Sequence, residues 1–176
     1  MLRRDILLPL NDKHADDLRR SGLSNTTITA LGFYSADEQE VMSVLKRKTP
    51  VGPGMVIPYP KFPDYKRVKL DVPFADESGN KRKYMASWGS GNHLYIPPQA
   101  DAVKDDPSKP LIITEGEKKA AKSCQDGYPC VAISWVLNFL SKDNQTGESL
   151  TISDFDLFNW RDRSVFILFD SDWSMN

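Results

Sequence analysis

Acidic side chains follow two apolar segments of this 176-residue chain, and their type and spacing suit metal-assisted chemistry. Glu115 follows the first segment, and Asp170 and Asp172 follow the second. Because Asp170 and Asp172 are two residues apart, an extended chain places both carboxylates on one side. Carboxylate oxygens without a nearby Cys or His select Mg²⁺ or Mn²⁺ over zinc, and hydrated Mg²⁺ keeps positions for substrate phosphates. The spacing therefore predicts a divalent-cation site.

A structural role for these acids is the alternative interpretation. An aspartate after a strand often caps the next helix, and the carboxylate of Glu117 would interact favourably with the positive end of the dipole of a helix that begins there. Gly116 removes a side chain where the chain turns into that helix, which lets a phosphate or a metal ion approach the backbone. A P-loop enzyme is disfavoured, since the chain lacks Gly-x-x-x-x-Gly-Lys-Ser/Thr.

Strand and helix alternate in the part of the chain that carries the acids. Apolar, non-alternating strands are predicted over residues 111–114, 130–133 and 165–169, and a helix over residues 117–124. This order favours parallel crossovers in an open α/β sheet, whose ligand site lies beyond the carboxyl ends of the strands. We therefore predict an α/β domain over residues 110–176, with the acids at one edge of its sheet.

The preceding residues predict a smaller α+β lobe. Residues 1–48 indicate short helices near 16–22 and 24–30, and a third after a capping box at Ser35 and Glu38. Residues 49–98 predict a basic, β-rich lobe. Its small antiparallel sheet would use the alternating segment around 67–72, with an exposed and mostly basic face, a return strand at 82–86 and a third strand at 93–96. Residues 99–109 are expected to be a polar linker.

Composition excludes several classes of protein. The net charge of −1 will not draw the whole molecule to a polyanion, so such contacts require a local patch. Residues 61–83 are rich in basic and 143–176 in acidic side chains, although solvated faces explain that pattern as well. Two cysteines and two histidines lack zinc-site spacing, so we expect no zinc. With no apolar run long enough for a membrane span, we expect a cytoplasmic protein without membrane contact.

Two segments resemble a known family. Ile112-Ile-Thr-Glu-Gly-Glu-Lys-Lys-Ala120 and Val165-Phe-Ile-Leu-Phe-Asp-Ser-Asp172 are similar to the Toprim fold of primases, topoisomerases, small nucleases and recombination proteins. The resemblance is strongest to a Toprim-related domain of unknown function carried by plasmid and phage replication proteins. Residues 17–24, 54–59, 67–71, 83–84, 89–92 and 94–97 resemble the region that precedes that domain. The resemblance implies an open, parallel Toprim-like sheet that is incomplete at its C-terminal side.

The resemblance also implies roles for individual residues. Glu115 matches the Toprim glutamate, a metal ligand or general acid/base, and Asp170 and Asp172 match the metal-binding aspartates. Lys83 and Tyr84 match a lysine–tyrosine element near the site of Toprim primases. The residues expected to act in catalysis are Glu115, Asp170, Asp172 and Lys83. The residues expected to contact nucleic acid or phosphate are Arg67, Lys69, Tyr84, Gly116, Lys118 and Lys119, although solvent exposure alone also explains the two lysines that follow Glu117.

These observations lead to two expectations about function. The first is Mg²⁺- or Mn²⁺-dependent phosphoryl or nucleotidyl transfer on nucleic acid, either primer synthesis or strand cleavage, because metal, cations and orientation are what such transfers need. DNA, above all single-stranded, and nucleotides would be the partners, and a helicase domain or partner chain would cover the apolar surface at residues 165–169. The alternative is a non-catalytic module that binds DNA or docks a helicase, with its acids retained for folding.

Overall fold

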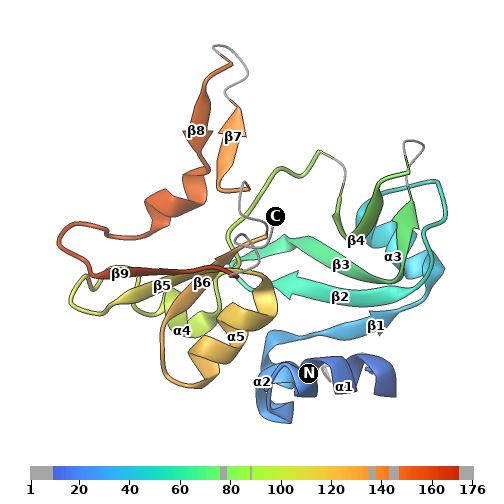
Figure 1. The fold of residues 1–176 in the computed structure, drawn as a ribbon, viewed down its shortest axis with the longest axis horizontal. Helices are drawn as coiled ribbons and strands as arrows, with labels where there is room; N and C mark the ends of the chain where they lie inside the picture. Colours follow the sequence, from blue (N-terminus) through green and yellow to red (C-terminus); the bar gives the residue numbers. More distant parts are fainter. Residues whose placement is uncertain (1–9, 76–78, 88, 135–137, 143–146, 171–176) are drawn as a thin grey trace, which may run out of the picture. The chain divides into compact units, whose positions relative to one another are not determined.

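The computed structural model describes residues 10–75, 79–87, 89–134, 138–142 and 147–170 (Figure 1). The chain forms two compact units, which are described separately. Unit 1 contains residues 1–59 and 63–90, and unit 2 contains residues 60–62 and 91–176. Antiparallel strand pairs form the sheet of unit 1 and parallel pairs that of unit 2, so the predicted mixed α/β class is confirmed. No helix in the described ranges is long and apolar enough to cross a membrane.

The described residues of unit 1 form a four-stranded sheet with three helices. The strands are β1 (Tyr34–Ala36), β2 (Gly54–Tyr59), β3 (Phe62–Ala75) and β4 (Lys81–Ala86), in the order β1-β2-β3-β4. The helices are α1 (Asp12–Arg20), α2 (Asn25–Leu31) and α3 (Glu38–Leu45). Val41 and Leu45 of α3 are fully buried against Val56 and Val68 of the sheet. This apolar cluster is the core of the unit, because burial of such side chains is the main force that stabilises a fold.

The helix starts of unit 1 follow local sequence signals with one exception. Ser24 caps α2 as predicted, since its side chain accepts a hydrogen bond from the Thr27 N–H. The third helix was predicted to begin at Ser35, but its N-cap is Asp37, which accepts from the Glu40 N–H. The reason is that Ser35 is taken up by β1, which pairs antiparallel with β2. Pairing with a distant strand therefore overrides a local capping pattern.

Unit 2 is built on a parallel sheet with strand order β6-β5-β9. Its strands are β5 (Leu111–Glu115), β6 (Cys130–Ile133) and β9 (Val165–Leu168), and β5 pairs parallel with both neighbours. The other elements are α4 (Pro98–Asp101), α5 (Glu117–Gln125), the 3₁₀ helix η1 (Ser153–Leu157) and the antiparallel hairpin β7 (Leu140–Lys142) and β8 (Ser149–Thr151). The predicted strand–helix–strand order is confirmed, because each of these strands is short, apolar and bounded by turn residues.

Helix α5 packs against β6 through small side chains. Ala120, Ala121 and Cys124 form its buried face. The Cys130 N–H of β6 donates to Cys124 Sγ at 3.3 Å. Burial raises the pKa of Cys124 to about 11 and that of Cys130 to about 12, so both thiols are protonated at neutral pH. The two cysteines therefore act as small apolar side chains of the core.

Strand β9 is the edge of the parallel sheet and is poorly covered. All four of its side chains are exposed, with Phe166 at 55% and Ile167 at 64%, and the following Phe169 is 42% exposed. The expected apolar surface at residues 165–169 is therefore present within the described ranges. Both the apolar side chains and the open backbone edge of such a strand favour association with another segment.

Residues 93–96 do not form the predicted third strand of the small sheet. Tyr95 instead pairs with Ala132 of β6, with backbone hydrogen bonds of 2.8 and 3.0 Å, and the segment belongs to unit 2. His93 and the Leu94 N–H are both held by the carboxylate of Asp154, which is 7% exposed. The segment was misplaced because its partners are about 40 to 60 residues further along the chain and leave no local signal.

The predicted linker is an ordered part of unit 2. Its first residues form α4, and the turns that follow are held by Arg163, which is 8% exposed. The guanidinium donates to four carbonyl oxygens, those of Val103, Lys104, Lys109 and Asn159, at 2.8–3.3 Å. One buried cation therefore replaces the sheet or helix partners that these backbone groups would otherwise need.

Candidate active site at the edge of the parallel sheet

The parallel pairing of β5 and β9 brings the two acidic segments together. Thr114 pairs with Leu168, and its hydroxyl donates to the Leu168 carbonyl at 2.7 Å. The residues that follow this pair therefore leave the sheet at the same edge. The backbone N–H of Asp170 donates to Glu115 Oε1 at 3.1 Å, although the two residues are 55 positions apart in sequence. Asp172, the third predicted ligand, lies outside the described residues.

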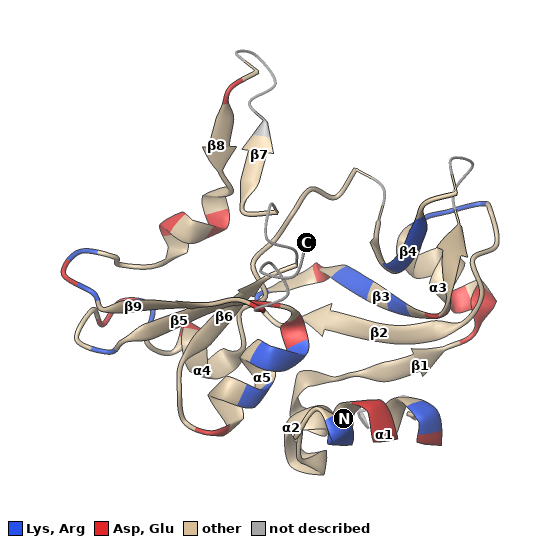
Figure 2. Cartoon of the chain, viewed as in Figure 1, with Lys and Arg blue, Asp and Glu red and all other residues tan. Residues whose placement is uncertain are grey.

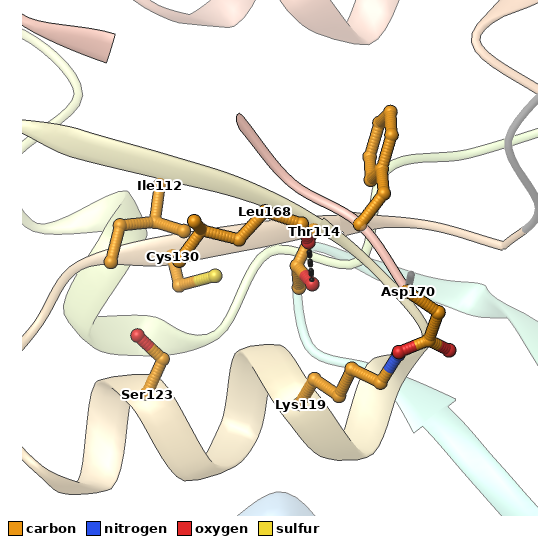
Figure 3. A pocket seen from close by; sticks show the side chains of 8 residues that line it. Ile112, Thr114, Lys119, Ser123, Cys130, Leu168 and Asp170 are labelled. Carbon is orange, nitrogen blue, oxygen red and sulfur yellow. Dashed lines mark hydrogen bonds and ion pairs between the residues drawn. The ribbon is translucent and has the colours of Figure 1, made fainter. Parts of the chain in front are cut away.

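Lys119 of α5 reaches the same two acids. Its ammonium forms an ion pair with Asp170 Oδ1 (Figure 3) and lies 3.8 Å from Glu115 Oε1. The ammonium of Lys119 holds the pKa of Asp170 below its ordinary range. The Asp170 side chain is 53% exposed and that of Glu115 is 21% exposed, so solvent and ligands can reach both carboxylates.

A cavity of about 300 Å³ adjoins these groups. Its polar lining comes from Thr114, Lys119, Ser123 and Asp170, and the rest includes the apolar residues Ile112, Leu168 and Phe169 (Figure 3). Helix α5 forms one wall, and the edge strand β9 contributes to another. An apolar hollow with a few convergent polar groups is typical of a ligand site, and this volume is at the small end of the usual range.

The start of α5 shapes the approach to the acids. Gly116 has a φ of +84°, which side-chain-bearing residues rarely adopt, and it is the N-cap of the helix. A Cβ at Gly116 would meet no atom within 4 Å, so the backbone conformation alone requires glycine. Glu117 is only 3% exposed, and Lys118 is half-buried. Of the charged residues in this first turn, Lys119 is the exposed one.

The donor set fits a magnesium or manganese ion. Mg²⁺ in proteins is commonly held by one or two carboxylates together with substrate phosphates and water. Glu115 and Asp170 supply two carboxylates at a solvent-exposed edge. Within the described ranges no group of three or more His, Cys, Asp or Glu side chains gathers at one point, so these two acids alone carry the fit.

The predicted phosphate-contacting residues of unit 1 are not all exposed. Arg67 is 9% exposed, and its guanidinium stacks 5.2 Å from the centre of the Tyr84 ring. Lys69 Nζ lies 2.6 Å from Asp17 Oδ2. The Lys69 side chain is only 15% exposed, so the prediction of an exposed basic face on this strand is wrong for both Arg67 and Lys69. Lys83 of β4 is exposed.

A second cavity, of about 160 Å³, lies in unit 1 and is basic. Its residues are Lys13, His14, Asp17, Arg20, Lys69, Leu70, Asp71 and Lys83. Figure 2 shows the basic positions on α1, β3 and β4. Four lysine or arginine side chains against two carboxylates leave an excess of positive charge, which suits an anionic ligand. Sequence analysis missed the part played by α1, although Lys13, Asp17 and Arg20 are spaced to share one helix face.

His14, for which the sequence suggests no partner, joins α1 to two strands. Its Nδ1 lies 2.7 Å from Ser35 Oγ of β1 and its Nε2 lies 2.6 Å from Asp71 Oδ1 of β3. His14 is 4% exposed, and Lys13 lies 3.3 Å from the other oxygen of Asp71. This partly buried network fixes α1, and with it the cations on α1 that line the basic cavity.

We expect Asp71→Asn to destabilise unit 1 by about 1–3 kcal/mol at neutral pH, since hydrogen bonds to a charged group are lost. Burial raises the pKa of Asp71. The hydrogen bonds and charges of His14 and Lys13 lower it by more than this, so the net pKa of Asp71 is below 3.8. The stability that this carboxylate contributes is therefore present above pH 3.8 and is lost as the pH falls through the lowered pKa of Asp71.

Urea unfolding at neutral pH and at about pH 3 measures both effects. The variant should lose stability at neutral pH and show a weaker dependence on acid than the parent chain. Asp64→Asn, at an exposed position of β3, is the control and should change neither. Equal stability of the Asp71→Asn variant and the parent at both pH values would contradict the role of this network.

Comparison with solved structures defines the fold class. The chain is similar to the Aquifex aeolicus primase in a crystal structure of its zinc-binding and RNA polymerase domains, with a TM-score of 0.53 and 14% sequence identity. The match covers 91% of this chain and 43% of that chain, so the protein spans less than half the length of the primase chain. At this identity the likeness shows the fold alone, and the fold is primase-like.

The family comparison concerns unit 2. Residues 101–176 match the family model described as a domain of unknown function, DUF3854. The match begins at the last residue of α4 and includes β5, α5 and β9, and therefore both Glu115 and Asp170. A search of curated proteins found no match.

Proposed function

We propose that this chain is a Toprim-type, replication-associated domain that catalyses Mg²⁺- or Mn²⁺-dependent nucleotidyl or phosphoryl transfer on nucleic acid. Primer synthesis is the favoured reaction and strand cleavage the second. The observation that carries the proposal is the contact of Glu115 with Asp170 at the carboxyl edge of the parallel sheet. The primase-like fold supports the choice of primer synthesis. A plasmid or phage origin, which the Toprim resemblance implies, and the cytoplasmic location expected from the sequence belong to the same proposal.

The residues of the chain would share the work of this reaction. Glu115 and Asp170, with Asp172, would hold the metal ion, which supplies charge stabilisation to phosphate oxygens when it is bound. Glu115 is oriented by the Asp170 N–H, which its Oε1 accepts. Gly116 leaves the backbone open to a phosphate, and Lys83 and the other cations of the basic cavity would bind the phosphates of a single-stranded template or a nucleotide.

A primer-synthesis assay tests this proposal. The chain is incubated with single-stranded DNA, labelled ribonucleotides and either Mg²⁺ or Mn²⁺, and the products are separated by length. Labelled oligonucleotides that appear only with metal would support primer synthesis, and shortening of an end-labelled DNA strand would support cleavage. If neither product forms with either metal, the proposed catalysis is wrong.

A non-catalytic role in DNA binding is the second candidate, and the basic cavity of unit 1 favours it. The excess of cations at that cavity binds phosphates without any need for the carboxylates of unit 2. The exposed apolar strand β9 would then be a docking surface for a helicase domain. This candidate predicts DNA binding that is unchanged when EDTA removes divalent ions, together with no product in the assay above.

Lys83→Ala and Arg20→Ala should each weaken binding of single-stranded DNA. Each substitution removes one phosphate contact, so the slope of log K against log salt should become less steep by about 0.7. Fluorescence anisotropy of a labelled oligonucleotide at several salt concentrations measures this slope. Lys48→Ala, an exposed lysine of unit 1 outside the basic cavity, is the matched control. A slope that stays at the parent value in both variants would contradict the assignment of this cavity.

A further inference from the structure

Lys119 occupies an unusual place for a basic residue. It lies in the first turn of α5, where the helix dipole disfavours a positive charge. Its ammonium does not extend away from the protein but reaches the carboxylate of Asp170 (Figure 3) and lies 3.8 Å from Glu115 Oε1. Lys122, one turn later on the same helix, instead forms an ion pair with Asp126 of its own segment. The contrast shows that the acids at the sheet edge, rather than the helix, determine the direction of Lys119.

The ammonium of Lys119 lies where a positive charge is most needed. Two carboxylates held together by the Asp170 N–H would repel each other, and a cation beside both removes that repulsion. Lys119 Nζ is paired with one oxygen of Asp170 and is 3.8 Å from the Glu115 oxygen that accepts this N–H. A divalent ion held by the same two carboxylates would compete with Lys119 for the same electrostatic attraction.

We propose that Lys119 is a tethered cation that neutralises Glu115 and Asp170 in the metal-free protein and competes with the divalent ion for them. Release from Asp170 leaves the ammonium at the wall of the 300 Å³ cavity, where it can bind a phosphate oxygen of the substrate. Lys119 thereby weakens metal binding by the free protein and gives the substrate a charge partner. This inference rests on the proposed function, because it assumes that Glu115 and Asp170 hold the metal.

Titration of the full chain with Mn²⁺, followed by electron paramagnetic resonance without nucleotide or DNA, tests the inference. Lys119→Gln removes the charge and keeps much of the length, so we expect Mn²⁺ to bind about fivefold more tightly, a change typical of an exposed ion pair. Lys119→Arg keeps the charge and should bind Mn²⁺ like the parent chain. Lys122→Gln, on the same helix but paired with Asp126, is the matched control and should also behave like the parent.

The melting temperature is a second readout, and its value in EDTA does not depend on metal binding. In EDTA the Lys119→Gln variant should have a lower melting temperature than the parent, because its two carboxylates repel each other. Added Mg²⁺ should raise the melting temperature of Lys119→Gln by more than it raises that of the Lys122→Gln control. Tighter Mn²⁺ binding together with this restoration supports the inference. If Mn²⁺ binding requires Glu115 but Lys119→Gln binds Mn²⁺ no more tightly than the parent does, the inference is wrong and the proposed metal site stands. Mn²⁺ binding that Glu115→Gln leaves unchanged, or no binding by either the parent or Lys119→Gln, overturns the proposed metal site and the inference together.

Discussion

Glu115→Gln is expected to reduce metal-dependent product formation by at least about 100-fold, because loss of a carboxylate ligand removes several kcal/mol of charge stabilisation. The substitution is nearly isosteric, and the amide oxygen of glutamine can still accept the Asp170 N–H that Glu115 accepts at 3.1 Å. The fold should therefore remain intact while the charge is lost. Rates of primer synthesis over a range of Mg²⁺ and Mn²⁺ concentrations measure the effect.

Asp162→Asn is the matched control for this prediction. The side chain of Asp162 is 93% exposed, and its positive φ of 60° is one that asparagine also adopts readily. This variant should keep the activity of the parent chain. Full activity of Glu115→Gln would show that Glu115 is not a metal ligand in the reaction, provided that circular dichroism confirms equal folding of all three proteins.

Arg163→Met is expected to lower the free energy of unfolding of unit 2 by about 3–5 kcal/mol, among the largest effects of any single substitution in this chain. The guanidinium is buried and donates to four backbone carbonyls, three of them in the segment between α4 and β5. Methionine fills much of the same space but has no donor, so these carbonyls lose their partners. Urea unfolding monitored by far-ultraviolet circular dichroism measures the loss.

Arg161→Met separates the effect of buried hydrogen bonds from that of losing a positive charge. Arg161 has a side chain that is 91% exposed and lies 3.9 Å from the equally exposed Asp162. Its removal should change stability by less than about 0.5 kcal/mol. Similar losses in the two variants would mean that Arg163 does not hold the segment through its hydrogen bonds.

The central elements of unit 2 were predictable because their signals are local. Short apolar runs define β5, β6 and β9, and residues with high helix propensity define α5 between the first two. The rule that parallel strands end at one edge then suggested that Glu115 and Asp170 meet. Their contact follows from the strand order β6-β5-β9, which makes β5 and β9 direct neighbours.

The features that could not be predicted depend on partners far away in sequence. His14 contacts Ser35 and Asp71, which are 21 and 57 residues away. Arg163 holds carbonyls 54 to 60 residues earlier in the chain. A single buried polar residue has no periodicity, so only the folded chain reveals what it binds. Lys119 illustrates the same limit, because its spacing suggested solvent or phosphate and the structure shows two carboxylates.

The burial of Cys124 and Cys130 gives the protein an internal reporter. These are the only cysteines of the chain, and both belong to unit 2. Because the thiolate is the reactive form and both thiols are covered and protonated, an alkylating reagent can modify them only after α5 separates from β6. The rate of alkylation of the unmodified protein therefore measures how often unit 2 opens, and it is insensitive to opening that is confined to unit 1.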